Sequence, residues 1–376
     1  MSVFALLLGL IYASIQIYLL HHWNIWDGWQ IPENFIPKTS VSIIIPARNE
    51  SENIEACLRS IANQQYPVEL FEIIVVDDYS EDDTVARIRD LEEPAISIIE
   101  LKAMDLPATR AHKKRALELG IMQSTSDLII TTDADVEVGG YWIATIVSFF
   151  EAYSPSLVTG PVLFSSGKTS FQRFQALDFM GMMGVTGGGI ASGLFHMSNG
   201  ANMSFTRAAY ESVNGYDGVD HIASGDDILL TQKMIEHGLS VRFLKCKHAI
   251  VETQPVSNIT DFYNQRLRWG AKSEHYHEKA IVWVQFVVLI TCLSILAFLF
   301  LTPLRPIKYI WPLCVLWGIK IAVDYYCLKS YSKFFDRQDL LKAFGISQIY
   351  HVLYISIIGL LSVFVRKYTW KGREVK

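Results

Sequence analysis

Cysteine is scarce in this chain and is not arranged for disulfides or for zinc. Only 5 of the 376 residues are cysteine, and no two of them form a Cys-x-x-Cys pair. Three of them, Cys292, Cys314 and Cys327, fall in apolar stretches. A disulfide framework or a structural zinc site is therefore not supported, and a reducing compartment is the default expectation.

The chain also lacks an excess of positive charge. Its 33 lysines and arginines are outnumbered by 38 aspartates and glutamates, which gives a formal net charge of −5. Bulk electrostatics therefore give no case for binding nucleic acid. Apolar residues, by contrast, are abundant: 51% of the chain is hydrophobic, and the mean hydropathy is +0.24. This composition predicts membrane segments joined to a globular part.

Several apolar stretches are long enough to cross a bilayer, which takes about 20 residues. They are Val3–Leu20, Ile281–Pro303, Ile307–Leu328 and Ala343–Val365. The first two contain no charged residue, whereas the third contains Lys308, Lys320 and Asp324. Because Lys320 and Asp324 are four residues apart, they are predicted to pair on one helix face.

The first apolar stretch lacks the features of a cleaved signal peptide. It has neither a basic start nor an obvious small-residue cleavage site, so we interpret it as an uncleaved anchor. Before the second stretch, Ile259–Lys272 is amphipathic, with Phe262 and Leu267 set against charged residues. We expect this segment to lie along the membrane surface.

From Ser40 onward, strand patterns alternate with helix patterns. Strands are predicted at Val41–Ile45, Glu72–Val76, Ile96–Leu101 and Leu128–Thr132, and helices at Glu52–Gln65, Thr84–Leu91 and Lys113–Met122. This alternation predicts an α/β domain with a mostly parallel sheet and helices on both faces. Further on, the predicted strands are Leu157–Phe164, Val241–Leu244 and Ala249–Val251, and Ile228–Glu236 is a predicted helix.

Polar clusters follow the predicted strands at their carboxyl ends, where ligands of open α/β sheets bind. These clusters are Pro46–Glu50, Asp77–Asp78 and Asp133–Asp135. Asp133 and Asp135 leave a buried strand one residue apart, so their side chains point the same way. Two hard oxygen ligands in that place suit a divalent cation such as Mg²⁺ or Mn²⁺. For an isolated Asp-x-Asp, a plain polar turn is the alternative.

Three other stretches admit more than one interpretation. Gly181–Gly193 lacks the preceding strand and the following Lys-Ser/Thr of a phosphate-binding loop, and it fits a flexible lid, a surface for an apolar acceptor or an ordinary loop. Asp226 and Asp227 precede a predicted helix, where they suit either N-terminal capping or catalysis. Lys114 and Arg115 are interpreted as a solvated face, with a phosphate contact left open.

A series of short motifs resembles the membrane-bound glycosyltransferases of family 2. The motifs are Pro46-Ala-Arg-Asn-Glu50, Val76-Asp-Asp-Tyr-Ser80, Lys113 three residues before Ala116-Leu117, Asp133-Ala-Asp135, Gly225-Asp-Asp227 and Gln265-Arg-Leu-Arg-Trp269. Each motif alone is weak, but the ordered series followed by membrane spans is specific. The resemblance covers the whole predicted globular part, and polysaccharide synthases and ceramide glucosyltransferases share the pattern.

The resemblance implies the GT-A fold, a nucleotide-diphospho-sugar transferase domain with a mostly parallel sheet, joined to N- and C-terminal transmembrane helices. It implies a division of the chain into five parts. These are an anchor at 1–22, a catalytic domain at 40–255, an amphipathic interfacial segment with the Gln-x-x-Arg-Trp motif at 256–280, a transmembrane region at 281–366 and a basic tail at 367–376.

The resemblance further implies a nucleotide-sugar donor, usually UDP-linked, and a metal ion, Mg²⁺ or Mn²⁺. Asp133 would contact the donor near its ribose or diphosphate, Lys113 would approach the donor, and Asp135 would hold the metal. The residues implied to line the nucleoside pocket are Ala47, Asn49, Glu50 and Asp78.

The same resemblance assigns the catalytic carboxylate and the leaving-group contacts. Asp227 would be the catalytic base, with Asp226 beside it, and Gln265, Arg268 and Trp269 would hold the diphosphate and border the acceptor site. Inverting transfer needs a base for the acceptor hydroxyl and charge stabilisation for the departing diphosphate, and these residue types can supply both.

The chain departs from the family pattern at two positions. His112 stands where a glycine often precedes the lysine, and Asp226 stands where many relatives have glutamate. The second change keeps the carboxylate, so neither departure removes a group that the chemistry needs.

The expected activity is transfer of a hexosyl or N-acetylhexosaminyl group to a membrane lipid or lipid-linked acceptor. A processive polysaccharide synthase subunit is the alternative. The small number of spans disfavours it, since a secretion channel needs a larger helical bundle, although an oligomer or a second subunit could complete one. A non-enzymatic scaffold is disfavoured, since it has no need for separate carboxylate clusters at strand ends. The oligomeric state is left open.

Nucleotide sugars are cytosolic, so the catalytic domain is expected to face the cytoplasm, in bacteria at the inner membrane. The N-terminus is then outside, and further spans place the basic tail outside as well. That placement opposes the positive-inside tendency. The alternative that resolves the conflict is that Ile307–Leu328 or the last stretch is re-entrant or interfacial rather than spanning.

Overall fold

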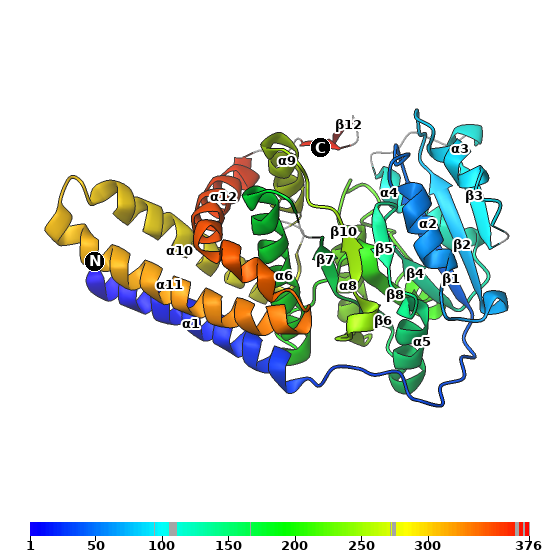
Figure 1. The fold of residues 1–376 in the computed structure, drawn as a ribbon, viewed down its shortest axis with the longest axis horizontal. Helices are drawn as coiled ribbons and strands as arrows, with labels where there is room; N and C mark the ends of the chain where they lie inside the picture. Colours follow the sequence, from blue (N-terminus) through cyan, green and yellow to red (C-terminus); the bar gives the residue numbers. More distant parts are fainter. Residues whose placement is uncertain are drawn as a thin grey trace. The chain divides into compact units, whose positions relative to one another are not determined.

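The structure is a computed structural model of the chain and describes residues 1–93, 95–104, 111–165, 167–270, 272, 276–364, 368–370 and 373–375. The chain forms two compact units. We call Met1–Trp26, Phe164–Phe195 and Pro255–Tyr368 the helical unit, and Asp27–Leu163, His196–Gln254 and Thr369–Lys376 the sheet unit. The ribbon is drawn in Figure 1.

The sheet unit is built on a seven-stranded sheet in the order β3-β2-β1-β4-β8-β6-β9. Its strands are β1 (Val41–Ala47), β2 (Phe71–Asp77), β3 (Ile96–Glu100), β4 (Leu128–Thr131), β6 (Leu157–Thr159), β8 (Met203–Thr206) and β9 (Val241–Phe243). Only β8 runs against its neighbours, while β1, β2, β3 and β4 are parallel. The predicted α/β class with a mostly parallel sheet is confirmed.

The strand order reverses direction between β1 and β4, because the chain adds β2 and β3 on one side of β1 and β4 on the other. Crevices at such switch points are where open α/β sheets bind ligands. The register places Ala47 opposite Asp77 at the carboxyl ends of β1 and β2, and Ile44 opposite Thr131 at the end of β4. The polar clusters seen in the sequence therefore emerge at one edge of the sheet.

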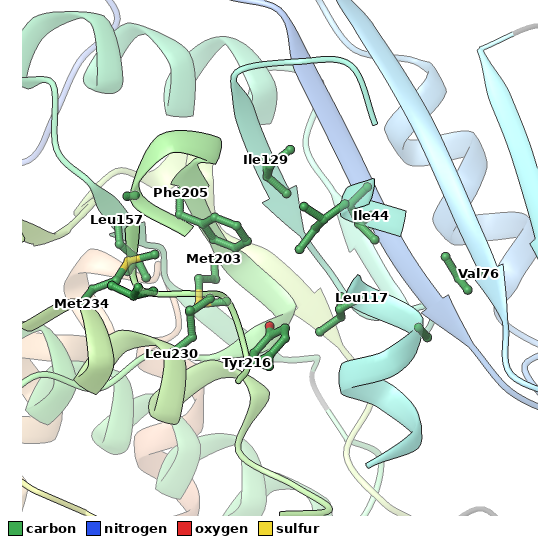
Figure 2. Close-up of a cluster of buried hydrophobic side chains, with 14 of the residues drawn as sticks. Ile44, Val76, Leu117, Ile129, Leu157, Met203, Phe205, Tyr216, Leu230 and Met234 are labelled. Atoms are coloured by element: carbon green, nitrogen blue, oxygen red, sulfur yellow. The ribbon is translucent and has the colours of Figure 1, made fainter. Parts of the chain in front are cut away.

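Helices connect these strands much as the sequence pattern predicts. They are α2 (Ile54–Ala62), α3 (Thr84–Arg89), α4 (His112–Gln123), α5 (Trp142–Tyr153), α7 (Arg207–Ser212) and α8 (Asp226–Glu236), with short 3₁₀ turns at Val68–Leu70, Leu101–Ala103, Gly200–Asn202 and Lys247–Ala249. Figure 2 shows part of the core, where Leu117 of α4 packs near Ile44 of β1, and Tyr216 lies between Leu117 and Leu230 of α8. Burial of these side chains fixes α4 and α8 on the sheet.

The prediction of one strand at Leu157–Phe164 was wrong. This stretch forms two strands, β6 and β7 (Val162–Phe164), which belong to different sheets. Gly160 separates them, and a Cβ there would lie 2.3 Å from the amide nitrogen of Asn202. Pro161 next to it has no N–H for a strand ladder. β7 joins the three-stranded sheet β5-β10-β7 with β5 (Val136–Val138) and β10 (Val251–Thr253).

The last predicted strand is displaced in the structure. Ala249 ends a 3₁₀ turn, and the strand begins two residues later, at Val251. The backbone N–H of Val251 donates to the carbonyl of Pro161.

The helical unit contains α1 (Ser2–Ile25), α6 (Ser170–Ser192), α9 (Ile259–Gly270), α10 (Lys279–Leu301), α11 (Pro306–Phe334), a 3₁₀ segment at Gln338–Ala343 and α12 (Phe344–Phe364). Among the described residues, four helical segments are long and apolar enough to cross a membrane: Ser2–Ile25, Lys279–Leu301, Pro306–Phe334 and Gln338–Ser362. They coincide with the four stretches predicted from the sequence. The amphipathic segment that precedes α10 is also helical, as α9.

The glycine-rich stretch is neither a lid nor a loop, because Gly181–Gly193 forms the second half of α6 and its cap. Its glycines allow close packing within the helical unit. A Cβ at Gly188 would lie 2.3 Å from the backbone oxygen of Leu19 in α1, and one at Gly184 would lie 2.4 Å from the Tyr331 ring of α11. Small residues let helices approach in this way. The helix was not predicted, because the glycine-rich sequence carries no helix signal.

The predicted pairing of Lys320 with Asp324 on α11 is confirmed. The pair is part of a buried polar group in the helical unit. Tyr12 of α1 donates to Asp324 over 2.6 Å, and the side-chain amide of Gln348 in α12 donates to the same carboxylate over 2.9 Å. The two charges thus neutralise each other on α11, and neutral donors from neighbouring helices complete the hydrogen bonds of Asp324.

The predicted basic tail is described only in part. Its backbone forms the short pair β11 (Tyr368–Trp370) and β12 (Arg373–Val375). The tail residues 367, 371, 372 and 376 lie outside the described residues.

Candidate functional site

Two loops at the carboxyl ends of β1 and β2 hold each other in place. Asp78 donates its backbone N–H to the carbonyl of Ala47 over 2.8 Å. The guanidinium of Arg48, which is buried, donates to the carbonyls of Asp78 and Tyr79. Asn49 adopts a positive φ of 51°, a conformation that asparagine tolerates better than most residues. These contacts fix the backbone around Ala47, Asn49 and Asp78.

Further hydrogen bonds tie the same loops to the start of α3. The Asn49 side-chain oxygen accepts the backbone N–H of Glu81 over 2.9 Å, and the backbone N–H of Glu50 donates to the hydroxyl of Thr84 over 2.8 Å. Asp78 itself is nearly buried, and one of its carboxylate oxygens lies 3.4 Å from Nδ1 of His112 at the start of α4. The four residues predicted for the nucleoside pocket thus lie on two mutually braced loops.

One lysine joins a carboxylate that follows β4 to a carboxylate at the start of α8. The ammonium of Lys113 lies 2.7 Å from Oδ1 of Asp133 and 3.2 Å from Oδ2 of Asp226. Three elements that are far apart in sequence therefore meet at a single nitrogen atom. Burial alone acts to lower the pKa of Lys113, but the carboxylates of Asp133 and Asp226 outweigh it and raise that pKa above its usual value. The neighbouring carboxylates thus favour the charged form of Lys113.

Gly200 lies at the centre of the cluster. Its backbone N–H donates to Oδ2 of Asp227 over 3.3 Å. A Cβ on Gly200 would lie 3.0 Å from Oδ2 of Asp226 and 3.2 Å from Nζ of Lys113. Nothing local in the sequence distinguishes this glycine from other loop glycines, so its role could not be predicted.

The end of β4 holds the Gly200 loop in position. The hydroxyl of Thr132 donates to the carbonyl of Ala201 over 2.8 Å. The Asn202 side chain accepts from the indole N–H of Trp142 and donates to the carbonyls of Pro161 and Ala249. The loop is therefore fixed to the same strand end that presents Asp133 and Asp135.

Lys114 was misinterpreted as part of a solvated face. Its side chain is 1% exposed, and its ammonium donates to the carbonyls of Val219, Ile222 and Ser224 over 2.6 to 3.1 Å. A signal for this was present in the sequence. Lys114, Leu117 and Ile121 are spaced as one face of a helix, and all three are buried.

Gln265, Arg268 and Trp269 lie on α9, in the helical unit. Between them, Arg266 is buried and lies 3.1 Å from the carboxylate of Asp178 on α6. Its guanidinium also stacks on the Trp269 ring, 4.2 Å from the ring centre. The motif thus contains one buried, ion-paired arginine, Arg266, and one partly exposed arginine, Arg268. The remaining predicted site residues all lie in the sheet unit.

Two family models match the chain. "Glycosyl transferase family 2" matches residues 42–212, and "Glycosyl transferase family group 2" matches residues 128–325, which is more than half of the chain. The chain belongs to glycosyltransferase family 2. This glycosyltransferase is 27% identical over 232 residues to the glycosyltransferase AglE of Haloferax volcanii, a match that covers 61% of this chain and 71% of that protein.

A second relative is a polymer synthase by name. The glycosyltransferase is 25% identical over 236 residues to the poly-beta-1,6-N-acetyl-D-glucosamine synthase of Staphylococcus epidermidis. That match covers 61% of this chain and 53% of the relative. The chain therefore aligns with about half the length of the synthase.

Among solved structures, the fold is similar to that of a mannosyltransferase from Pyrobaculum calidifontis, described in complex with GDP-Man and Mn²⁺. The TM-score is 0.54 at 16% identity, and the match covers 93% of this chain and 99% of the other. The similarity supports the GT-A fold predicted from the motifs, in which a divalent metal is plausible.

The acidic residues after β4 fit a divalent metal in this glycosyltransferase. Burial raises the pKa of the Cys57 thiol, and the nearby carboxylates of Asp135, Asp133 and Glu50 raise it further. These carboxylates therefore lie near one another at the end of the Asp-x-Asp motif. The described residues contain no group of three or more His, Cys, Asp or Glu side chains placed to hold a metal by themselves. A Mg²⁺ or Mn²⁺ site of few protein ligands is still chemically consistent, because such ions commonly take one or two carboxylates and complete their shell with substrate phosphates and water.

Proposed function

We propose that this protein is an inverting, metal-dependent glycosyltransferase that moves one sugar from a nucleotide-sugar donor, UDP-linked by preference, to a membrane lipid or lipid-linked acceptor. The observation that carries the proposal is the cluster of Asp133, Lys113, Asp226 and Asp227 around Gly200. It lies beyond the carboxyl ends of a parallel sheet, where this fold class binds ligands, in a chain that also has four strongly apolar helical segments.

The donor is assigned to the braced loops and to the residues after β4. Ala47, Asn49, Glu50 and Asp78 would contact the nucleoside, since they lie on the loops that follow β1 and β2. Asp133 would contact the ribose or diphosphate. Asp135 would hold Mg²⁺ or Mn²⁺, which when bound would neutralise diphosphate charge. The mannosyltransferase of similar fold, described with GDP-Man and Mn²⁺, supports this choice of donor class and metal.

Asp227 is assigned as the base that removes the proton of the acceptor hydroxyl. The hydroxyl oxygen would then form a bond to the anomeric carbon as the bond from that carbon to the diphosphate oxygen breaks, with inversion. The N–H of Gly200 orients the Asp227 carboxylate, and the Lys113 ammonium compensates the charge of Asp226.

The α9 motif is assigned to the leaving group and the acceptor. A guanidinium can bind two diphosphate oxygens at once, and this role goes to Arg268 with the help of Gln265. Trp269 would border the acceptor with an apolar face. Arg266 is excluded from ligand contact, because it is buried and paired with Asp178.

A lipid acceptor is proposed because the catalytic chain carries its own apolar helices. The catalytic domain is assigned to the cytoplasmic side, in bacteria of the inner membrane, where nucleotide sugars are available. The alternative of a processive synthase subunit is supported by the similarity to the Staphylococcus epidermidis synthase. A single transfer and a polymer differ in product size, so one assay separates them.

The test is an incubation of the purified full-length protein with a panel of UDP- and GDP-sugars and native lipid extract, with and without Mn²⁺. We expect one donor to yield a lipid-extractable product that carries a single added sugar, and we expect this product only when metal is present. A long polymer as the product would favour the processive synthase over single transfer. Absence of transfer from every donor would contradict the enzymatic assignment.

A further inference from the structure

Two lysines from different helices converge on the segment that leads into Asp226 and Asp227. This segment, residues 213–224, connects α7 to α8 by turns and bends alone, and we call it the approach segment. Lys114 of α4 donates to the carbonyls of Val219, Ile222 and Ser224. Lys233 of α8 donates to two earlier carbonyls in the segment, those of Gly215 and Asp217.

The beginning of the approach segment is also held by apolar packing. Val213 and Tyr216 are buried in the core cluster that includes Leu117 and Leu230, and Figure 2 shows Tyr216 between these two side chains. In the later part, Val219 is partly buried and packs against the same cluster, whereas Ile222, Ala223 and Ser224 are all partly exposed. For residues 220–224, the main described attachment to the body of the sheet unit is the ammonium of Lys114.

Convergent carbonyl oxygens repel one another unless a cation or several N–H donors lie between them. An ammonium group carries three N–H donors, which matches the three carbonyl acceptors that Lys114 satisfies. The Lys114 ammonium is thus coordinated by backbone oxygens much as a small metal cation would be. The later part of the approach segment is therefore arranged around this ammonium group.

The last of these carbonyls belongs to Ser224, two residues before Asp226. Only Gly225 lies between them, in a left-handed conformation with φ of 80° that glycine adopts without strain. Neighbouring Lys113 on the same helix contacts Asp226 directly. Helix α4 therefore contacts the Asp226 carboxylate through Lys113 and holds the backbone just before it through Lys114.

We propose that Lys114 is a positioning residue for catalysis: its ammonium acts as a template for residues 219–224 and thereby sets the place of Asp226 and Asp227. The inference rests on the proposed function, because it assigns Lys114 an effect on the base rather than on the donor. Its distinguishing prediction is a loss of turnover without a loss of donor binding.

The test compares Lys114→Met with Lys233→Met in the full-length protein. Methionine keeps the length and apolar character of the stem but leaves the three carbonyl oxygens without the ammonium. We expect Lys114→Met to lower kcat by at least about a hundredfold, because small displacements of a catalytic group carry costs of that order, with the donor Kd within about threefold of wild type. Lys233→Met is the matched control, since it frees carbonyls at the core-anchored start, and it is expected to keep kcat within about threefold.

Hydrogen–deuterium exchange provides a second readout. If Lys114→Met fails to fold, the measurements are made on Lys114→Gln, whose side chain retains two N–H donors. Faster exchange confined to peptides covering residues 219–230, together with reduced kcat and unchanged donor Kd, is the expected result. A kcat within threefold of wild type, or a donor Kd weakened as much as kcat, in either Lys114 variant would overturn the proposal.

The same assay separates this inference from the function on which it rests. If wild type transfers sugar and Asp227→Asn does not, the proposed function stands, and the Lys114 variants decide the positioning role alone. If wild type transfers nothing from any donor, the proposed function fails first, and Lys114 is left without a catalytic group to position.

Discussion

The backbone N–H of Gly200 donates a hydrogen bond of 3.3 Å to Oδ2 of Asp227. This contact aligns the carboxylate assigned as the base with a loop fixed to the end of β4 by Thr132. It requires a residue without a side chain, because a Cβ at Gly200 would press on Asp226 and Lys113.

Gly200→Ala should therefore lower activity more than stability. A Cβ 3.0 Å from Asp226 Oδ2 and 3.2 Å from Lys113 Nζ forces these groups apart by a few tenths of an ångström. We expect kcat to fall about ten- to a hundredfold with little change in the midpoint of thermal unfolding. Gly139→Ala is the matched control, since a Cβ there meets nothing within 4 Å. Equal kcat values for the two variants would show that the Gly200 contact does not orient the base.

The Lys113 ammonium should stay charged throughout the working pH range. Its pKa is raised in the folded protein by Asp133 and Asp226 in spite of burial. The stabilisation is fully present below the unfolded pKa of about 10.4 and is lost only as pH rises through the higher folded value. The difference in thermal unfolding midpoint between wild type and Lys113→Met should thus be equal at about pH 6 and about pH 9. If the difference in unfolding midpoint were smaller at the higher pH, the Lys113 ammonium would lose its proton at a lower pH than this account predicts.

The two arginines of the α9 motif should separate stability from catalysis. Arg266→Gln leaves the buried Asp178 carboxylate without its partner, and losses of this kind cost about 3–5 kcal/mol. Arg268→Gln removes a partly exposed charge, so it should cost less than about 1 kcal/mol of unfolding free energy but reduce transfer. Unfolding in detergent and a transfer assay on both variants provide the measurements. If Arg268→Gln were the more destabilising variant, the described packing of α9 would be incorrect.

Much of the sheet unit could be predicted from sequence, because its signals are local. The runs at Val41–Ala47 and Phe71–Asp77 are apolar and β-prone, and the polar residues that follow each strand lie at its carboxyl end. Parallel strands bring those ends to one edge. The location of Asp78 and Asp133 at one edge of the sheet was therefore predictable, whereas their contacts with His112 and Lys113 were not.

The features that escaped prediction depend on packing between distant segments. Lys113 and Lys114 are adjacent in sequence, and only the positions of the Asp226 carboxylate and the Ser224 carbonyl show which partner each lysine takes. The glycines of α6 look like loop residues until Leu19 and Tyr331 supply surfaces that need them. Likewise, Gly160 ends β6 because Asn202 occupies the space beside it.

The central claim is that Asp135 holds the metal that binds the donor, whereas Asp227 is the base that acts on the acceptor. It is tested most directly by measuring donor binding and sugar transfer in parallel for Asp135→Ala and Asp227→Asn. The account predicts that Asp135→Ala abolishes metal-dependent donor binding, whereas Asp227→Asn binds the donor as wild type does and loses transfer by about two to four orders of magnitude. Full metal-dependent activity in Asp135→Ala, or undiminished transfer in Asp227→Asn, would contradict it.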